Sequence, residues 1–158
     1  MSSELITSWT DHDNSLRRIL LLATQTIRVL DADLATLKLE PPANAELLRD
    51  FLGRGQNNRL QIVVKNAEPF RRDSPRLMKL LATYPKRMTI VECPPHLAAL
   101  NDSMLICDDR HALVRFHQGQ ARAKVIVDSA SECAPYVQRF AAMVEEGGTA
   151  IGATTLGL

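Results

Sequence analysis

Apolar side chains recur along this chain with two alternating spacings, one helical and one extended. Helical spacing predicts helices across residues 16–27, 47–52, 77–84 and 133–144. Short β-rich apolar runs predict strands across residues 27–30, 60–64, 88–92, 104–107, 112–114 and 121–127. The resulting order is three helix–strand pairs, then three strands and a closing helix, which predicts an α/β fold with a mixed sheet flanked by helices. The early helical crossovers favour parallel pairing of the first strands.

The stretch from Leu100 to Gln118, LNDSMLICDDRHALVRFHQ, has the pattern of an antiparallel hairpin. A polar turn, Asp108-Asp109-Arg110, separates the two apolar runs at 104–107 and 112–114. Both runs are almost continuously apolar, so we expect both faces of the hairpin to be covered.

Polar and proline residues predict where the helices begin and end. We expect capping of the first helix by residues 11–14, which places Trp9 outside it, and capping of the second by Asn44. Ser129-Ala130-Ser131-Glu132 has the spacing of a capping box. Pro135 would clash with a preceding helical turn, so the last regular helix is expected to begin near residues 131–135. The length of 158 residues favours a single domain, which we expect to span residues 1–148. The small, uncharged segment 149–158 is expected to be a flexible C-terminal tail.

Composition narrows the classes of partner. Lys plus Arg number 19 and Asp plus Glu 18, and this balance argues against a nucleic-acid or membrane partner. No apolar run approaches the roughly 18 residues of a membrane span, and the first residues lack the pattern of a secretory signal. The three cysteines are far apart in the chain. They are typical of reduced core residues in a cytoplasmic protein.

The order of elements around the hairpin resembles one half of the phospholipase D superfamily. That family carries His-x-Lys-x4-Asp on a strand, followed by Gly-Ser and an Asn after a second strand. Without gaps, these positions fall in turn on Asn101, Ser103, Asp108, Arg115-Phe116 and Gln118. The resemblance is residue-specific only around 100–146, and it extends to uncharacterised bacterial domains that are degenerate members of the family.

The resemblance implies a site without the family's chemistry. In the family, the His attacks phosphorus and the Lys holds the phosphoryl oxygens. An amide at Asn101 is not a comparable nucleophile, and Ser103 has no positive charge. Arg115 and Phe116 are expected to fill space where the family has small residues. We therefore expect no catalytic residue, no metal and no cofactor.

A binding role follows from this resemblance. We expect a protein-interaction module, or a binding module for a small anionic ligand. The ligand-binding residues would be Asn101, Ser103, Asp108, Arg115 and His117. Single-half members of the family pair, so the resemblance also implies a homodimer.

Alternatives remain open at several of these residues. Asp108 also suits plain turn chemistry, and Arg115 suits an anion, an ion pair with Asp108, or solvent. His111 and His117 suit solvated surface positions, or a displaced active site of a weak phosphodiesterase or nuclease. Cys93 and His96 form only half of a zinc pattern.

A nucleic-acid-binding module is the remaining alternative. Arg71, Arg72 and Arg76 form a local basic cluster that suits phosphate contacts. The near-zero net charge favours a solvated face at this cluster instead.

Overall fold

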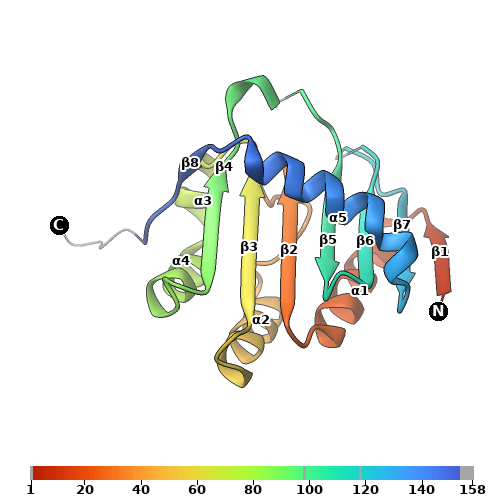
Figure 1. Ribbon diagram of the computed structural model, residues 1–158, viewed down its shortest axis with the longest axis horizontal. Coiled ribbons are helices and arrows are strands. Elements are labelled where there is room, and N and C mark those ends of the chain that lie inside the picture. The colour runs from red at the N-terminus through yellow and green to blue at the C-terminus, as the bar shows by residue number, and fades with distance from the viewer. Residues whose placement is uncertain (1, 98, 118, 154–158) are drawn as a thin grey trace.

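The computed structural model describes residues 2–97, 99–117 and 119–153, which form an eight-stranded mixed sheet flanked by helices (Figure 1). The sheet order is β1-β7-β6-β5-β2-β3-β4-β8. The strands are β1 (Ser2–Ile6), β2 (Thr26–Asp31), β3 (Arg59–Val64), β4 (Met88–Glu92), β5 (Ser103–Cys107), β6 (His111–Arg115), β7 (Ala123–Val127) and β8 (Thr149–Ala150). The helices are α1 (Trp9–Leu22), α2 (Pro42–Arg54), α3 (Glu68–Asp73), α4 (Pro75–Thr83), α5 (Ala130–Glu145) and the short 3-10 turn Pro95–Leu97.

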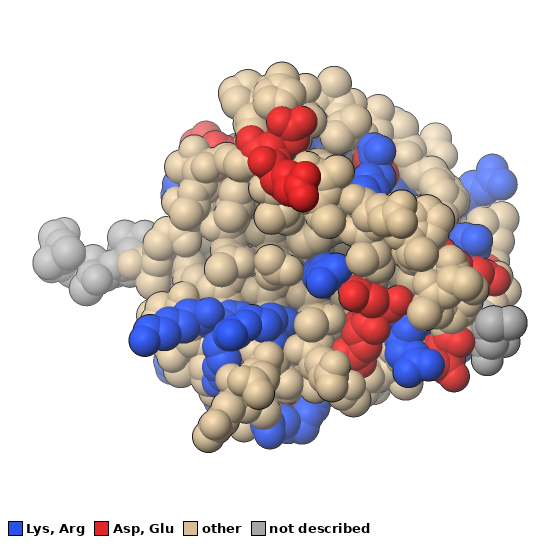
Figure 2. Space-filling view, in the orientation of Figure 1, with Lys and Arg blue, Asp and Glu red and all other residues tan. Residues whose placement is uncertain are grey.

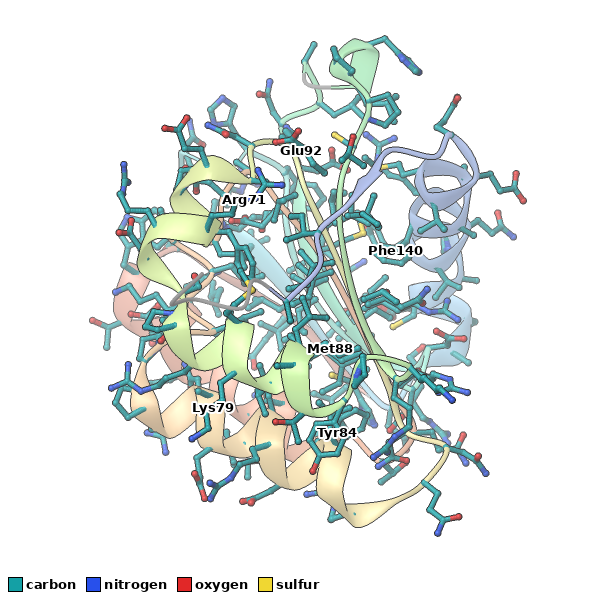
Figure 3. The ribbon with its side chains drawn as sticks, turned by 90° about the vertical axis from the view of Figure 1, so that its left-hand side faces the viewer. Arg71, Lys79, Tyr84, Met88, Glu92 and Phe140 are labelled. Atoms are coloured by element: carbon teal, nitrogen blue, oxygen red, sulfur yellow. The ribbon has the colours of Figure 1, made fainter. Side chains whose placement is uncertain are left out.

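The predicted α/β architecture with a mixed sheet is confirmed. Strands β2, β3 and β4 pair in parallel, and the remaining pairs are antiparallel. One core lies between the sheet and α1–α4, and a smaller core lies between the sheet and α5. Figure 3 shows this division, with Met88 on the sheet and Phe140 on α5 pointing toward it. Within the described ranges, no helix combines the length and apolar character needed to cross a membrane.

The predicted hairpin is β5 and β6. All residues of both strands are buried, which confirms that both faces are covered. Leu105 and Leu113 pack toward α1, whereas Met104 and Val114 pack toward α5. The near-continuous apolar pattern therefore has a direct cause, because alternate side chains enter two different cores.

The N-terminal segment differs from the prediction. Helix α1 begins at Trp9, because the Ser8 hydroxyl accepts a hydrogen bond from the Asp11 amide at 3.1 Å and caps the helix. The expectation that Trp9 lies outside the helix was wrong. Strand β1 was not predicted, because a five-residue edge strand with only two apolar residues carries little pattern. The short helix α3 was missed for the same reason.

Two other boundaries were also predicted wrongly. Asn44 does not cap α2 but lies inside it, and its side-chain amide donates to the Lys38 carbonyl. Helix α5 begins at Ala130, where Ser129 caps it as the capping-box spacing predicts, but the helix continues through Pro135 instead of starting after it.

The tail expectation is corrected for residues 149–151. Thr149 and Ala150 form β8 against β4, and buried Ile151 donates its amide to the Ile90 carbonyl at 2.8 Å. The fold unit therefore extends beyond residue 148. Residues 154–158 lie outside the described residues.

Candidate functional site

Three polar side chains meet at one end of the central strands of the sheet, where β2 ends, β5 begins and β6 ends. The antiparallel register places Ser103 opposite Arg115, and Met104 opposite Leu30 on β2. Side chains alternate between faces, so Asp31, Ser103 and Arg115 all point to the side of the sheet that α1 covers. The ends of these three strands thus bring together residues that are far apart in the sequence.

Arg115 lies at the centre of this group. Its side chain is 1% exposed, and its Nη2 donates to Asp31 Oδ1 and to Ser103 Oγ, each at 3.1 Å. The guanidinium carbon lies 5.2 Å from the centre of the Trp9 ring, a cation–π contact. Burial lowers the pKa of Arg115, and the charge of Asp31 acts in the opposite direction. The interpretations in which Arg115 pairs with Asp108 or faces solvent are therefore wrong.

His12 joins this group from α1 and was not identified from the sequence. It is 0% exposed, its ring centre lies 5.4 Å from that of Trp9, and its Nδ1 lies 3.5 Å from Asp13 Oδ1. Burial, followed by the charge of Arg115, lowers the pKa of His12 and favours the neutral ring. A signal was present, because His12 precedes Leu16 by four residues and therefore shares the apolar face of the helix.

Asp108 lies at the opposite end of β5 from Ser103. Its carboxylate accepts the amides of Thr24, Gln25 and Thr26 and the hydroxyl of Thr24, at 2.7–3.0 Å. Burial alone would raise the pKa of Asp108, but these hydrogen bonds outweigh burial and lower it. Asp108 thus fixes the connection between α1 and β2, and the structure separates it from the other predicted site residues.

The remaining predicted site residues lie around the same end of the sheet as Arg115. Asn101 and His117 are exposed, and His117 Nδ1 accepts the Gly119 amide at 3.1 Å. Phe116 is 52% exposed, so the expectation that it fills the site was wrong, whereas Arg115 does fill space there. Gln118, at the family's Asn position, lies outside the described residues.

His111 was expected at the surface but is buried. It lies opposite Cys107, at the far end of the hairpin from Arg115, and its Nδ1 accepts the Asp128 amide at 3.0 Å. Burial lowers the pKa of His111. Its position and its hydrogen bond give it a structural role.

The candidate zinc residues do not converge. Among the residues that the structure describes, no three His, Cys, Asp or Glu side chains form a metal-binding group. His96 lies 3.6 Å from Glu146, whereas Cys93 is buried. Burial raises the pKa of Cys133 to about 11 and that of Cys107 well above its usual range, so both thiols stay protonated at neutral pH.

The basic cluster on α3 and α4 is largely neutralised. Arg72 lies 3.0 Å from Asp73, and Arg76 lies 3.2 Å from Glu40. Arg71 points outward from α3 in Figure 3. Two of the three cations named in the nucleic-acid alternative therefore have carboxylate partners.

Comparisons with known proteins agree with this fold. Residues 9–151 match a family described as a domain of unknown function, DUF7931. No curated protein sequence matches the chain.

Three solved structures have a similar fold. Nuc, a phospholipase D family member from Salmonella typhimurium, shares 14% identity at a TM-score of 0.67, with 96% of this chain and 98% of that chain covered. NucT from Helicobacter pylori shares 12% identity at a TM-score of 0.59, with the same coverage. TrmBL2, an archaeal chromatin protein with a novel mode of DNA binding, shares 13% identity at a TM-score of 0.72. The match covers 96% of this chain and 54% of TrmBL2, so this chain spans about half of that protein. The fold is phospholipase D-like.

Proposed function

This chain belongs to the DUF7931 family, and we propose that it is a non-catalytic phospholipase D-like domain that acts as a protein-interaction module. The observation that carries the proposal is the buried ion pair between Arg115 and Asp31, with Ser103 as a further acceptor. This group lies where the resemblance to the phospholipase D superfamily places the phosphate-binding Lys and the Gly-Ser pair.

The chemistry of the group supports the absence of phosphodiester cleavage. The aligned nucleophile position holds Asn101, and the aligned cation position holds Ser103, which is 1% exposed. The nearby cation, Arg115, already donates to Asp31, so binding a phosphoryl oxygen would require breaking a buried ion pair. This arrangement also favours an interaction role over binding of a small anion at the same edge.

The exposed aromatic residues near Arg115 support an interaction surface. The ring of Trp9 contacts Arg115, but Trp9 is still 40% exposed. Phe116, which follows Arg115 in the chain, is 52% exposed. Aromatic side chains are enriched at protein interfaces, where they bury much area at little entropic cost. We assign this edge to contact with a second copy of the chain, which gives a homodimer.

The absence of catalysis is tested with bis(p-nitrophenyl) phosphate. We expect hydrolysis at the background rate for the natural protein and for the Asn101→Ala and His117→Ala variants. Turnover that disappears in His117→Ala and persists in Asn101→Ala would establish the displaced-histidine enzyme instead.

The interaction role is tested by sedimentation equilibrium. We expect the mass of two chains for the natural protein and of one chain for a Trp9→Ser, Phe116→Ser double variant. Val144→Ser is the matched control, because Val144 is 42% exposed and lies on α5, on the opposite side of the sheet from Trp9. A monomeric natural protein, or a double variant that stays dimeric, would contradict the assignment.

A further inference from the structure

Helix α5 covers its side of the sheet unevenly. It crosses the face diagonally, lies only near the carboxyl ends of β2 and β3, and does not reach over β4 (Figure 1). Figure 3 shows the same arrangement from the side, with no helix over the lower part of that face. The amino-terminal halves of three strands are therefore uncovered on this side.

The uncovered half of the face carries a polar lattice. The register pairs Thr26 with Arg59, and it places Arg28, Gln61 and Thr89 in one row across the three strands. All five are partly or fully exposed. They alternate with three residues of the opposite core, which are Ile27, Leu60 and Met88. This half of the face is exposed, and its polar side chains need solvent or a polar ligand to satisfy their hydrogen bonds.

Positive charge collects on this half of the face. We call Arg28, Arg59 and Lys86 the basic strip. Arg59 donates to the Lys86 carbonyl at 3.4 Å, which places these two residues side by side. Figure 2 shows Lys and Arg side chains gathered at the lower left, over the amino-terminal ends of β3 and β4.

Most other Lys and Arg residues of the described chain have a carboxylate partner, whereas most residues of the basic strip have none. Within the described part of the chain, Arg59 and Lys86 have no carboxylate within 4.0 Å, whereas Arg28 lies 3.1 Å from Asp109. Elsewhere in the described chain, nine Lys and Arg residues form ion pairs with carboxylates, as in the pair of Arg110 with Asp128 at 2.7 Å. The whole-chain charge of +1 hides this local excess, because screening limits each charge to a range of about 10 Å.

We propose that the basic strip, with the adjoining hydroxyl and amide side chains of Thr26, Gln61 and Thr89, binds the phosphodiester backbone of a nucleic acid. Arginine forks, lysine ammonium groups, hydroxyls and side-chain amides are the donors that contact phosphate oxygens. Arg28 and Arg59 come from adjacent strands about 4.8 Å apart, and Lys86 lies in the turn before the next strand, so the three cations suit a ligand with several charges in a row. This surface lies at the opposite end of the sheet from Arg115 and does not depend on the interaction role.

The absence of apolar anchors on this surface distinguishes a nucleic acid from a membrane. The exposed large apolar side chains among the described residues lie on other elements, and none is on β2, β3 or β4. A membrane-surface site combines positive charge with apolar side chains that enter the lipid. Backbone contacts to phosphates need no such side chains, and they predict binding that weakens steeply with salt.

The test measures fluorescence anisotropy of a labelled single-stranded oligonucleotide of about 20 nucleotides in about 50 mM salt. We expect Arg59→Glu and Thr89→Glu each to weaken binding roughly tenfold, because each places a carboxylate beside the phosphates. Arg71→Glu is the matched control, since it makes the same charge change as Arg59→Glu on α3 and should leave the affinity unchanged. Asp109→Asn should tighten binding about twofold by releasing Arg28.

Three outcomes would overturn the proposal. The first is no binding by the natural protein in about 50 mM salt. The second is loss of binding in Arg71→Glu with retention in both strip variants. The third is equal competition by polyglutamate or by anionic phosphatidylserine vesicles, which would assign the strip to another kind of polyanion. Thermal unfolding of each variant confirms that it is folded, and Thr89→Glu tests the surface without removing any hydrogen bond of Arg59.

Discussion

The two ends of the β5–β6 hairpin stabilise charge in different ways. At one end, Arg115 and Asp31 form an ion pair in which both side chains are 1% exposed. At the other end, the carboxylate of Asp108 accepts backbone amides from the connection between α1 and β2. The first end joins side chains of separate strands, and the second fixes a turn of the backbone.

Asp108, the residue that the resemblance to the phospholipase D superfamily matches to the motif, serves the fold. The aligned Asp position keeps its residue, and here Asp108 holds the α1–β2 connection whether or not a catalytic site exists. The position that aligns with the His holds the exposed Asn101, and the position that aligns with the Lys holds Ser103, which accepts a hydrogen bond from Arg115. A residue that matches a catalytic motif is therefore weak evidence of catalysis when all of its hydrogen bonds go to one connection of its own fold.

The largest expected effect is at the buried pair. Asp31→Ala should lower the free energy of unfolding by about 3–5 kcal/mol, because it leaves the charge of Arg115 buried without its carboxylate. Urea unfolding measures the loss. Replacing both partners, with Asp31→Leu and Arg115→Met, should recover much of it. A single-variant loss below about 1 kcal/mol would mean that solvent reaches this end of the hairpin.

The next effect is at the other end. Asp108→Ala should lower the free energy of unfolding by about 2–3 kcal/mol, since it leaves the amides of Thr24, Gln25 and Thr26 without their acceptor. The lowered pKa of Asp108 means that its contribution is present above about pH 4 and is lost as the pH falls through the folded value. Urea titrations should therefore show that the free energies of unfolding of the natural and variant proteins differ at neutral pH and converge at acidic pH. A constant difference across this range would contradict the assignment.

A smaller, pH-dependent effect on stability is expected at His12, at the Arg115 end of the hairpin. His12 faces Arg115, Asp13 and Asp31, and its lowered pKa keeps the ring neutral in the folded state. Below about pH 6.5 the unfolded chain takes up the proton first, so stability should fall by about 1 kcal/mol per pH unit until the folded ring titrates. His111, whose pKa is also lowered, adds a dependence of the same sign. Urea unfolding between neutral pH and about pH 5.5 should give a shallower slope for His12→Gln, and an unchanged slope would assign the effect to His111.

The smallest effect provides the reference for the others. Arg110 and Asp128 form an ion pair beside the hairpin turn, with both side chains 53% exposed. Arg110→Ala should change the free energy of unfolding by less than about 0.5 kcal/mol, because water screens the pair. A loss comparable to that of Asp31→Ala would remove the distinction between buried and exposed pairs on which the comparison rests.

The sequence pattern predicts the interior of this fold better than its edges. Strands β2 to β7 are apolar enough to be found from spacing alone, since they lie within the sheet. Strand β1 and the short β8 owe their existence to partners, β7 and β4, that no local pattern reveals. The buried pair was missed for a related reason, because Asp31 and Arg115 are 84 residues apart and each looks like an ordinary polar residue at a strand end.

The pairing of β1 with β7 has a consequence for how the protein forms during its synthesis. Ser3 lies opposite Ile126, so the first strand has no partner until almost the whole domain has left the ribosome. The parallel unit of β2, β3 and β4 uses contacts that are much closer in sequence and can assemble earlier. Edge closure by β1 thus waits until β7 has been made, and the nascent chain carries an unpaired strand until that step is complete.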